Sequence, residues 1–320
     1  MRVQFKNILC ATDFSDFSNH TVNYGVALAR EFDARLTICH VIDLSSVAIY
    51  GEFQLDPIGQ QNRIVEDARA QLQELTGDQP IAWEPLVTVG KPADEITRAV
   101  EEKCIDLVIA ATRGRSGFKR LILGSVTERL MRILTCPLLV VRSPEHEAVK
   151  TPDKEIRLKK ILVGCDFSLD SQHAFQYGVS LAQEFEAELH ITHVIEPPAQ
   201  PHLIKEESPV SEEIREDYHN LLTQRLKEMI PKEAAVWCIP QTSILEGQAY
   251  EEIVEYAAAK DIDMIVMGVR GHGLVKTLFL GSTTDRVIRN SPCPVLSVSS
   301  KVHSGAASES CRPAGETADT

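Results

Sequence analysis

A glycine-rich stretch in the second half of the chain has the residue types and spacing of an anion-binding loop. Gly268 and Gly271 are followed, after nine further residues, by Gly281 and Ser282. An apolar run precedes this stretch and a helical pattern follows it. Because a loop between a strand and a helix presents backbone N–H groups and a helix N-terminus, it favours a negatively charged ligand.

The same layout recurs near residues 111–125, so each half of the chain is predicted to hold a phosphate-binding loop. Each half also has an acid directly after its first apolar run, Asp13 in the first half and Asp166 in the second. If the first and fourth strands are neighbours, this carboxylate and the loop face one crevice beyond the carboxyl ends of the strands. The carboxylate could then accept hydrogen bonds from ribose hydroxyls. Nearby basic residues would supply counter-charge to a triphosphate: Arg113, Arg115, Lys119 and Arg120 in the first half, and Arg270, His272 and Lys276 in the second.

Purely structural explanations of the same residues stay open. Ser125 with Glu128 forms a capping-box pattern, and Ser282 with Asp285 resembles one. The segment that begins with Asp13, and its counterpart in the second half, could simply cap the first helix. The coincidence of acid, glycine loop, basic residues and duplication favours ligand binding over capping alone.

An internal repeat sets the organisation of the chain. Lys6–Ser15 matches Lys159–Ser168, and Cys136-Pro137 matches Cys293-Pro294. Within each copy, short β-type runs alternate with amphipathic helical stretches, and several runs are almost continuously apolar, as in strands that are covered on both faces of a parallel sheet. The predicted strands are 5–12, 35–43, 81–89, 105–112 and 137–142, then 158–165, 187–195, 235–245, 262–269 and 294–299; the predicted helices of the first copy are 16–32, 60–76, 92–103 and 125–134.

The sequence therefore predicts an α/β fold with two tandem doubly wound, Rossmann-like five-stranded parallel sheets, each with the strand order 3-2-1-4-5. The expected boundaries are 1–145 for the first domain, 146–157 for a polar linker, 158–300 for the second domain and 301–320 for a disordered tail.

Composition argues against several classes of protein. With 43% hydrophobic and 25% charged residues, the 320-residue chain is typical of soluble globular proteins. The formal net charge of −13 argues against general nucleic-acid binding, which needs clustered Lys and Arg. No apolar run approaches the ~18–20 residues needed to cross a bilayer, and the first residues lack the apolar stretch of a signal peptide. We therefore expect no membrane contact and a cytoplasmic location.

The eight cysteines are scattered through apolar segments, without a Cys-x-x-Cys motif. This distribution predicts free thiols in a reducing compartment, and neither a disulfide framework nor a metal site.

On these residues the chain resembles the universal stress protein family in its tandem-domain form, over about residues 3–142 and 158–299. The family's ATP-binding signature is G-x2-G-x9-G-[S/T]. The second half matches it in full, whereas in the first half Ala111 replaces the first glycine, ahead of Gly114. A methyl group at this place either obstructs a phosphate or is harmless, depending on the backbone, so we expect the second site to be the better one.

The resemblance implies a ligand and a role for each residue of the two sites. The ligand would be ATP, alone or with Mg²⁺. Asp13 or Asp166 would contact the ribose, and Val41 or Val194 would contact the adenine through the backbone. The phosphates would be held by the loop glycines and the serine that follows them: Gly114, Gly124 and Ser125 in the first half, and Gly268, Gly271, Gly281 and Ser282 in the second.

The resemblance also implies an assembly and a function. The last strands, 138–141 and 295–298, would pair so that the two halves form an internal pseudo-dimer, and two chains would pair again as a homodimer. The expected function is that of an ATP-binding, non-enzymatic regulator or sensor in a stress response, and slow hydrolysis is compatible with it. The alternatives are an ATPase or adenylyl-transferring enzyme on the same fold, and an interaction module with vestigial sites.

Overall fold

The computed structural model describes residues 3–44, 57–77, 79–112, 123–142, 149–150, 155–197, 209–232, 234, 238, 240–271 and 281–300. Several sequence-based expectations lie outside these ranges. They concern the disordered tail, Gly114, and the basic residues Arg113, Arg115, Lys119, Arg120, His272 and Lys276.

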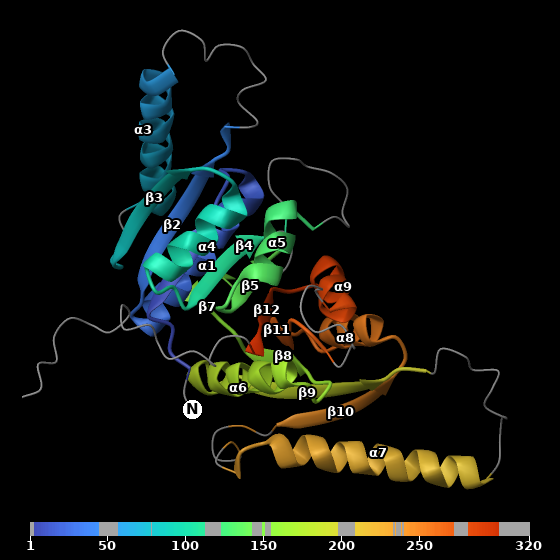
Figure 1. Ribbon diagram of the computed structural model, residues 1–320. Coiled ribbons are helices and arrows are strands. Elements are labelled where there is room, and N and C mark those ends of the chain that lie inside the picture. The colour runs from blue at the N-terminus through green and yellow to red at the C-terminus, as the bar shows by residue number, and fades with distance from the viewer. Residues whose placement is uncertain are drawn as a thin grey trace, which may run out of the picture.

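The first half alternates strands with helices in the predicted order (Figure 1). Its five parallel strands are arranged as β3-β2-β1-β4-β5, which confirms the order 3-2-1-4-5. All residues of β4 and β5 are buried, as their continuous apolar runs predict. The elements are β1 (Asn7–Ala11), α1 (Asp16–Phe32), β2 (Arg35–Ile42), α3 (Pro57–Thr76), β3 (Trp83–Val89), α4 (Pro92–Glu102), β4 (Leu107–Ala111), α5 (Ser125–Ile133) and β5 (Leu138–Val141).

The second half repeats this arrangement, with its strands in the order β10-β9-β8-β11-β12. Its third strand begins directly after Pro240, which has no N–H for a ladder hydrogen bond; the start predicted at 235 lies outside the described residues. The elements are β8 (Lys160–Gly164), α6 (Leu169–Glu184), β9 (Glu188–Ile195), α7 (Pro209–Met229), β10 (Gln241–Glu246), α8 (Ala249–Ala259), β11 (Met264–Gly268), α9 (Ser282–Asn290) and β12 (Val295–Val298).

The described part of the segment between the halves contains two short strands. Strands β6 (Val149–Lys150) and β7 (Glu155–Ile156) form a small antiparallel sheet. Ile156 and Leu158 are both buried in the main hydrophobic core. The burial of these two side chains anchors the junction of the predicted linker with the second domain to the body of the protein.

The two five-stranded sheets join into one sheet of ten strands. Strands β5 and β12 pair in antiparallel fashion, with Leu139 opposite Leu296 and Val140 opposite Val295. This pairing removes two exposed sheet edges, whose unpaired backbone groups would otherwise face solvent. The predicted pseudo-dimer through the last strands is therefore confirmed, but the sheets are continuous and not separate.

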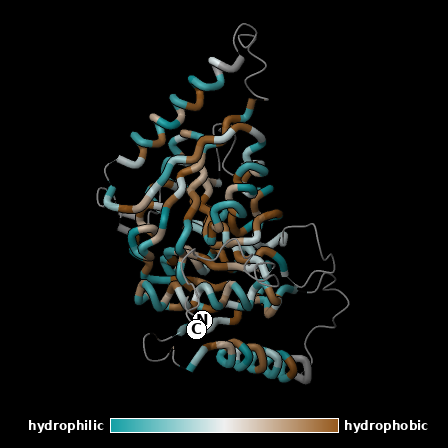
Figure 2. The backbone as a smooth tube through the Cα atoms, turned by 60° about the vertical axis from the view of Figure 1, so that its left-hand side comes forward, coloured by the Kyte–Doolittle hydropathy of each residue, from teal (hydrophilic) through white to brown (hydrophobic). Residues whose placement is uncertain are grey.

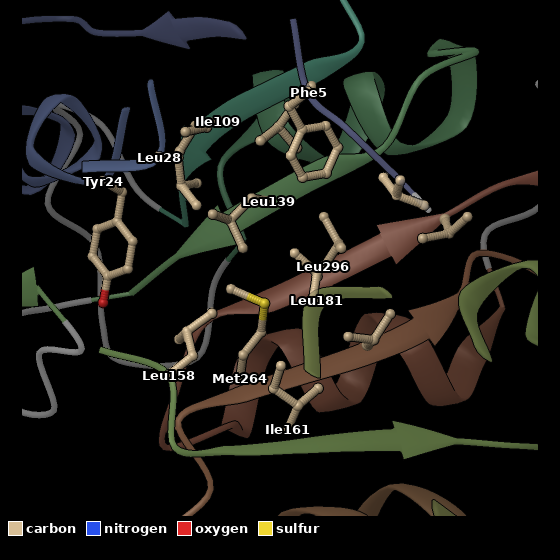
Figure 3. Packing of buried hydrophobic residues seen from close by; sticks show 14 of the residues in the cluster. Phe5, Tyr24, Leu28, Ile109, Leu139, Leu158, Ile161, Leu181, Met264 and Leu296 are labelled. Carbon is tan, nitrogen blue, oxygen red and sulfur yellow. The ribbon is translucent and has the colours of Figure 1, made fainter. Parts of the chain in front are cut away.

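Hydrophobic side chains from both halves pack across this junction. Figure 3 shows Leu139 and Leu296 in one cluster with Phe5, Ile161 and other buried residues. In Figure 2, hydrophobic stretches run through the strands in the middle of the molecule, whereas the outer helices alternate hydrophobic and hydrophilic residues. The N-terminal segment adds a further link, because the Val3 N–H donates to Ser180 Oγ on α6 at 2.6 Å.

The described cysteines correct one prediction. Six of them are free thiols: Cys10, Cys39, Cys136, Cys165, Cys238 and Cys293. Cys104, however, is disulfide-bonded, so the prediction of free thiols is wrong at this position. None of the helices in the part of the chain that the structure describes is long and apolar enough to pass through a bilayer.

Candidate functional site

A cavity of about 230 Å³ lies at the carboxyl ends of β1 and β4 in the first half. Its lining includes Asp13 after β1, Val41 on β2, and Gly124 and Ser125 at the start of α5. These are four of the five residues that the sequence assigns to the first site. The doubly wound topology places them together because β1 and β4 are neighbours at the point where the strand order reverses.

The walls of this cavity are mostly apolar. Cys39 and Ile96, neither of which the sequence indicated, line it together with Val41 and Ala111. Burial raises the pKa of the Cys39 thiol to about 12, so this side chain is neutral at physiological pH. Among the described residues that line the cavity, Asp13 alone carries a formal charge. The cavity thus suits a ligand that has an apolar part and hydroxyl groups that can donate hydrogen bonds to a carboxylate.

The acid after the first strand sits in a similar turn in both halves. Asp13 Oδ1 accepts hydrogen bonds from Ser15 N at 3.1 Å, Ser15 Oγ at 2.6 Å and Ser18 Oγ at 2.7 Å. Asp166 Oδ1 accepts from Ser168 N at 2.9 Å. Among the interactions that the structure describes, the first carboxylate is therefore more fully occupied by its own helix than the second.

The residue after each acid has an unusual backbone. Phe14 and Phe167 both have φ of 63°, a left-handed conformation that is strained for an aromatic residue. Each ring lies against a histidine of the next strand, with centroid distances of 4.3 Å to His40 and 4.9 Å to His193. Strain of ~1–3 kcal/mol persists only where the surroundings enforce it, and such places are often functional sites.

Side-chain capping is confirmed at the start of α1 and α6, but not at the start of α5 and α9. Ser15 and Ser168, and not the aspartates, are the N-caps of α1 and α6, and each accepts from a backbone N–H. The N-caps of α5 and α9 are glycines, with no side-chain capping hydrogen bond. Ser125 and Ser282 are therefore the first helical residues and are not N-caps, which argues against the capping-box explanation.

In the second half, the acid and the glycine loop also meet. A Cβ atom on Gly271 would lie 2.5 Å from Asp166 Oδ2. Gly281 N donates to Val269 O at 2.9 Å, and a Cβ atom on Gly281 would lie 2.9 Å from the same oxygen. Asp166, Gly271 and Gly281 thus share one edge of the sheet, and Ser282 begins α9 beside them. Val194 lies towards the carboxyl end of β9, opposite Leu245.

Gly268 has a packing role that the sequence did not indicate. A Cβ atom there would lie 2.7 Å from the Asp170 carbonyl carbon and 2.7 Å from Ser171 N, both in the first turn of α6. Its missing side chain therefore lets α6 approach β11 closely. The carbonyl oxygens of Gly268 and Ala111 each accept from a threonine hydroxyl at 2.7 Å, so the two strand ends are otherwise alike.

This geometry predicts unequal losses of stability when glycine and alanine are exchanged at these two equivalent positions. Gly268→Ala should destabilise the protein by ~1–3 kcal/mol. The new methyl group would clash with the backbone of α6, which can give way only if the whole helix shifts. The reciprocal Ala111→Gly should cost only ~0.5–1 kcal/mol, the usual effect of glycine within a strand. Urea unfolding of both variants checks this; equal losses of stability would contradict it.

Comparison with known proteins agrees with the fold and with the duplication. The model of the Universal stress protein family matches residues 4–142 and 157–299. Universal stress protein Slr1230 of Synechocystis is 26% identical over 313 residues, which cover 91% of this chain and 99% of that protein. Universal stress protein MJ0531 of Methanocaldococcus jannaschii is 31% identical over 145 residues, which cover 45% of this chain and 85% of that protein.

A solved structure shares the architecture of the whole chain. A universal stress protein from Archaeoglobus fulgidus superimposes with a TM-score of 0.67 at 23% identity, covering 93% of this chain and 99% of its own. This likeness shows the fold, and the family model accounts for both halves. The chain belongs to the universal stress protein family.

Proposed function

We propose that the protein binds ATP at the carboxyl ends of the parallel strands in each half and acts as a regulator or sensor, without catalysis as its purpose. The observation that carries this proposal is the first-half cavity, where Asp13, Val41, Gly124 and Ser125 converge. An apolar wall suits the adenine, the acid suits the ribose hydroxyls, and the N-terminus of α5 suits the phosphates. Membership of the family supports a role in stress response.

Each proposed contact would use a group near the carboxyl ends of the strands in its own half, and these ends lie on opposite sides of the joined sheet because β5 and β12 run antiparallel. The backbone of Val41 or Val194 would contact adenine, and the carboxylate of Asp13 or Asp166 would accept hydrogen bonds from the ribose hydroxyls. The N–H groups that begin α5 and α9 would face the phosphates, because the first N–H groups of a helix lack partners within it. Among the described residues, no three His, Cys, Asp or Glu side chains gather as a metal site. Because Mg²⁺ is usually bound through one or two carboxylates together with substrate phosphates, a Mg²⁺ ion would arrive as part of the Mg·ATP complex.

We expect the second site to bind ATP more tightly. Asp166 Oδ1 accepts one hydrogen bond within the described part of the chain, whereas Asp13 Oδ1 accepts three. A carboxylate with fewer protein donors offers more of its acceptor capacity to ribose hydroxyls. The free thiols of the described cysteines other than Cys104 are compatible with the cytoplasm. A second pairing of whole chains as a homodimer is part of the same proposal.

The decisive experiment is to identify the nucleotide that freshly purified protein releases on denaturation. We expect intact ATP, close to stoichiometric, and a rise of the unfolding temperature when millimolar ATP is added. Multiple-turnover hydrolysis with Mg²⁺ would indicate an enzyme instead. Protein that releases no nucleotide and shows no thermal shift with ATP would indicate an interaction module with vestigial sites.

A further inference from the structure

One buried acid in the second half links three segments of the chain. Asp170 lies in the first turn of α6 and is only 5% exposed. Its Oδ2 accepts from Arg270 N at 3.1 Å and from Arg270 Nε at 3.2 Å, and its Oδ1 accepts from Ser300 N at 2.9 Å. Arg270 Nη2 also donates to Ser299 Oγ at 2.5 Å. These contacts connect α6, the start of the glycine loop and the segment after β12.

The guanidinium of Arg270 is therefore held by protein groups. The sequence indicated this residue as counter-charge for a triphosphate, yet its side chain is paired with a buried carboxylate. Charge-assisted hydrogen bonds of this kind are among the stronger interactions within a protein. The observed geometry thus gives Arg270 a structural partner on the side of α6.

The backbone of Arg270 is also fixed at both ends of the residue. Its N–H donates to Asp170, and its carbonyl oxygen accepts from Ser168 Oγ at 3.3 Å. The next residue is Gly271, whose backbone lies against the carboxylate of Asp166. Fixing Arg270 therefore sets the position of Gly271 relative to this acid before any ligand is bound.

The first half does not have this acid. Asp170 is the fourth residue after Asp166, whereas the fourth residue after Asp13 is Phe17. The repeat likewise places Arg142 where the second half has Ser299, and Arg142 Nη1 donates to a backbone carbonyl oxygen on the other half at 2.7 Å. The two halves thus differ at Asp170 and Ser299, two residues whose side chains bind the side chain of Arg270.

We propose that Asp170 is a positioning residue of the second site, which holds Arg270 so that the adjoining Gly271 is preorganised against Asp166. The inference rests on the proposed function in that the ligand of this site is ATP. Preorganisation reduces the conformational freedom that a ligand must otherwise remove on binding, so it increases affinity. It also makes the two nucleotide sites of one chain unequal.

The test is Asp170→Asn in the full-length chain. The amide has one acceptor oxygen and one NH₂ donor, so either Arg270 or Ser300 would face a donor in place of an acceptor. In the ligand-free protein, amide exchange at Arg270 should accelerate by about tenfold or more, since its N–H loses a charged acceptor. ATP affinity should fall by about tenfold, measured by calorimetry in a Val41→Trp background that fills the first cavity.

Two further variants separate positioning from other roles. Glu188→Gln, at the amino end of β9 and so at the opposite edge of the sheet, is the matched control and should leave exchange and ATP affinity unchanged. Arg270→Lys keeps the charge and the backbone donor but loses the planar fork, so it should weaken ATP binding less than Asp170→Asn does.

Several results would overturn the inference. If Arg270 served the phosphates directly, Asp170→Asn would release it and ATP would bind more tightly, and Arg270→Lys would be the more harmful variant. If Asp170→Asn lowers the unfolding temperature but leaves amide exchange at Arg270 and ATP affinity unchanged, the contact between Asp170 and Arg270 is only structural. If the parent protein binds no ATP at all, the proposed function fails, and amide exchange at Arg270 alone decides whether Asp170 fixes the backbone of Arg270.

Discussion

Replacing Leu296 with aspartate should abolish stable folding of the whole chain. Leu296 is 2% exposed, lies on β12 and faces Leu139 of β5, at the junction where the two sheets meet. A carboxylate at this place would have to be buried without a partner or protonated, and we expect a loss of ~4 kcal/mol or more. Because the same core cluster contains residues of both halves, the loss should reach both of them.

The control for this variant is a leucine at the surface of the same half. Leu169 begins α6 and is 68% exposed, so Leu169→Asp should change stability by no more than ~0.5 kcal/mol. Urea unfolding followed by circular dichroism measures both variants. A Leu296→Asp protein that unfolds at the urea concentration of the parent would show that the two halves do not depend on the shared sheet.

The double variant Gly271→Val/Gly281→Val should lose ATP binding at the second site by about 100-fold while the protein remains folded. A Cβ atom at Gly271 would displace the carboxylate of Asp166, and one at Gly281 would push against the carbonyl oxygen of Val269. Both changes move backbone N–H groups away from the proposed phosphates, where each charged hydrogen bond contributes ~1.5–3 kcal/mol. Because a Cβ atom on Gly281 meets backbone, the double variant should lose some stability, but both glycines lie outside the strands, so the protein should still fold.

A glycine of the same half supplies the matched control. A Cβ atom on Gly164, at the end of β8, would lie 3.4 Å from the Met267 side chain, which is an ordinary contact. Gly164→Ala should therefore retain ATP as the parent does. Calorimetric titration in the Val41→Trp background isolates the second site. Equal ATP affinity in the double variant and the parent would place the ligand elsewhere on the molecule.

Much of the fold follows from local patterns in the sequence. The match between Lys6–Ser15 and Lys159–Ser168 indicates two copies of one unit, and continuous apolar runs indicate strands buried on both faces. The order 3-2-1-4-5 then brings the acid after the first strand next to the loop after the fourth. These inferences succeed because they depend on periodicity and on residue type along the chain.

Contacts between residues that are far apart in the sequence could not be predicted from such local patterns. Cys39 and Ile96 looked like ordinary core residues, yet they line the first cavity because β2 and α4 converge there. The disulfide at Cys104 is also invisible in a sequence whose cysteines show no pairing motif. In both cases the role of a side chain depends on neighbours that the fold supplies.

The sequence by itself determined the duplication, the fold class and the residues that could form two nucleotide sites, because each of these is written in short-range patterns. The tertiary structure alone decided that the two sheets merge through β5 and β12, that Gly268 makes room for α6, and that Asp170 holds Arg270. Asp170 and Arg270 stand 100 positions apart, and an acid in the first turn of a helix is common for local reasons. Only the packing of α6 against β11 brings that acid within hydrogen-bonding distance of Arg270.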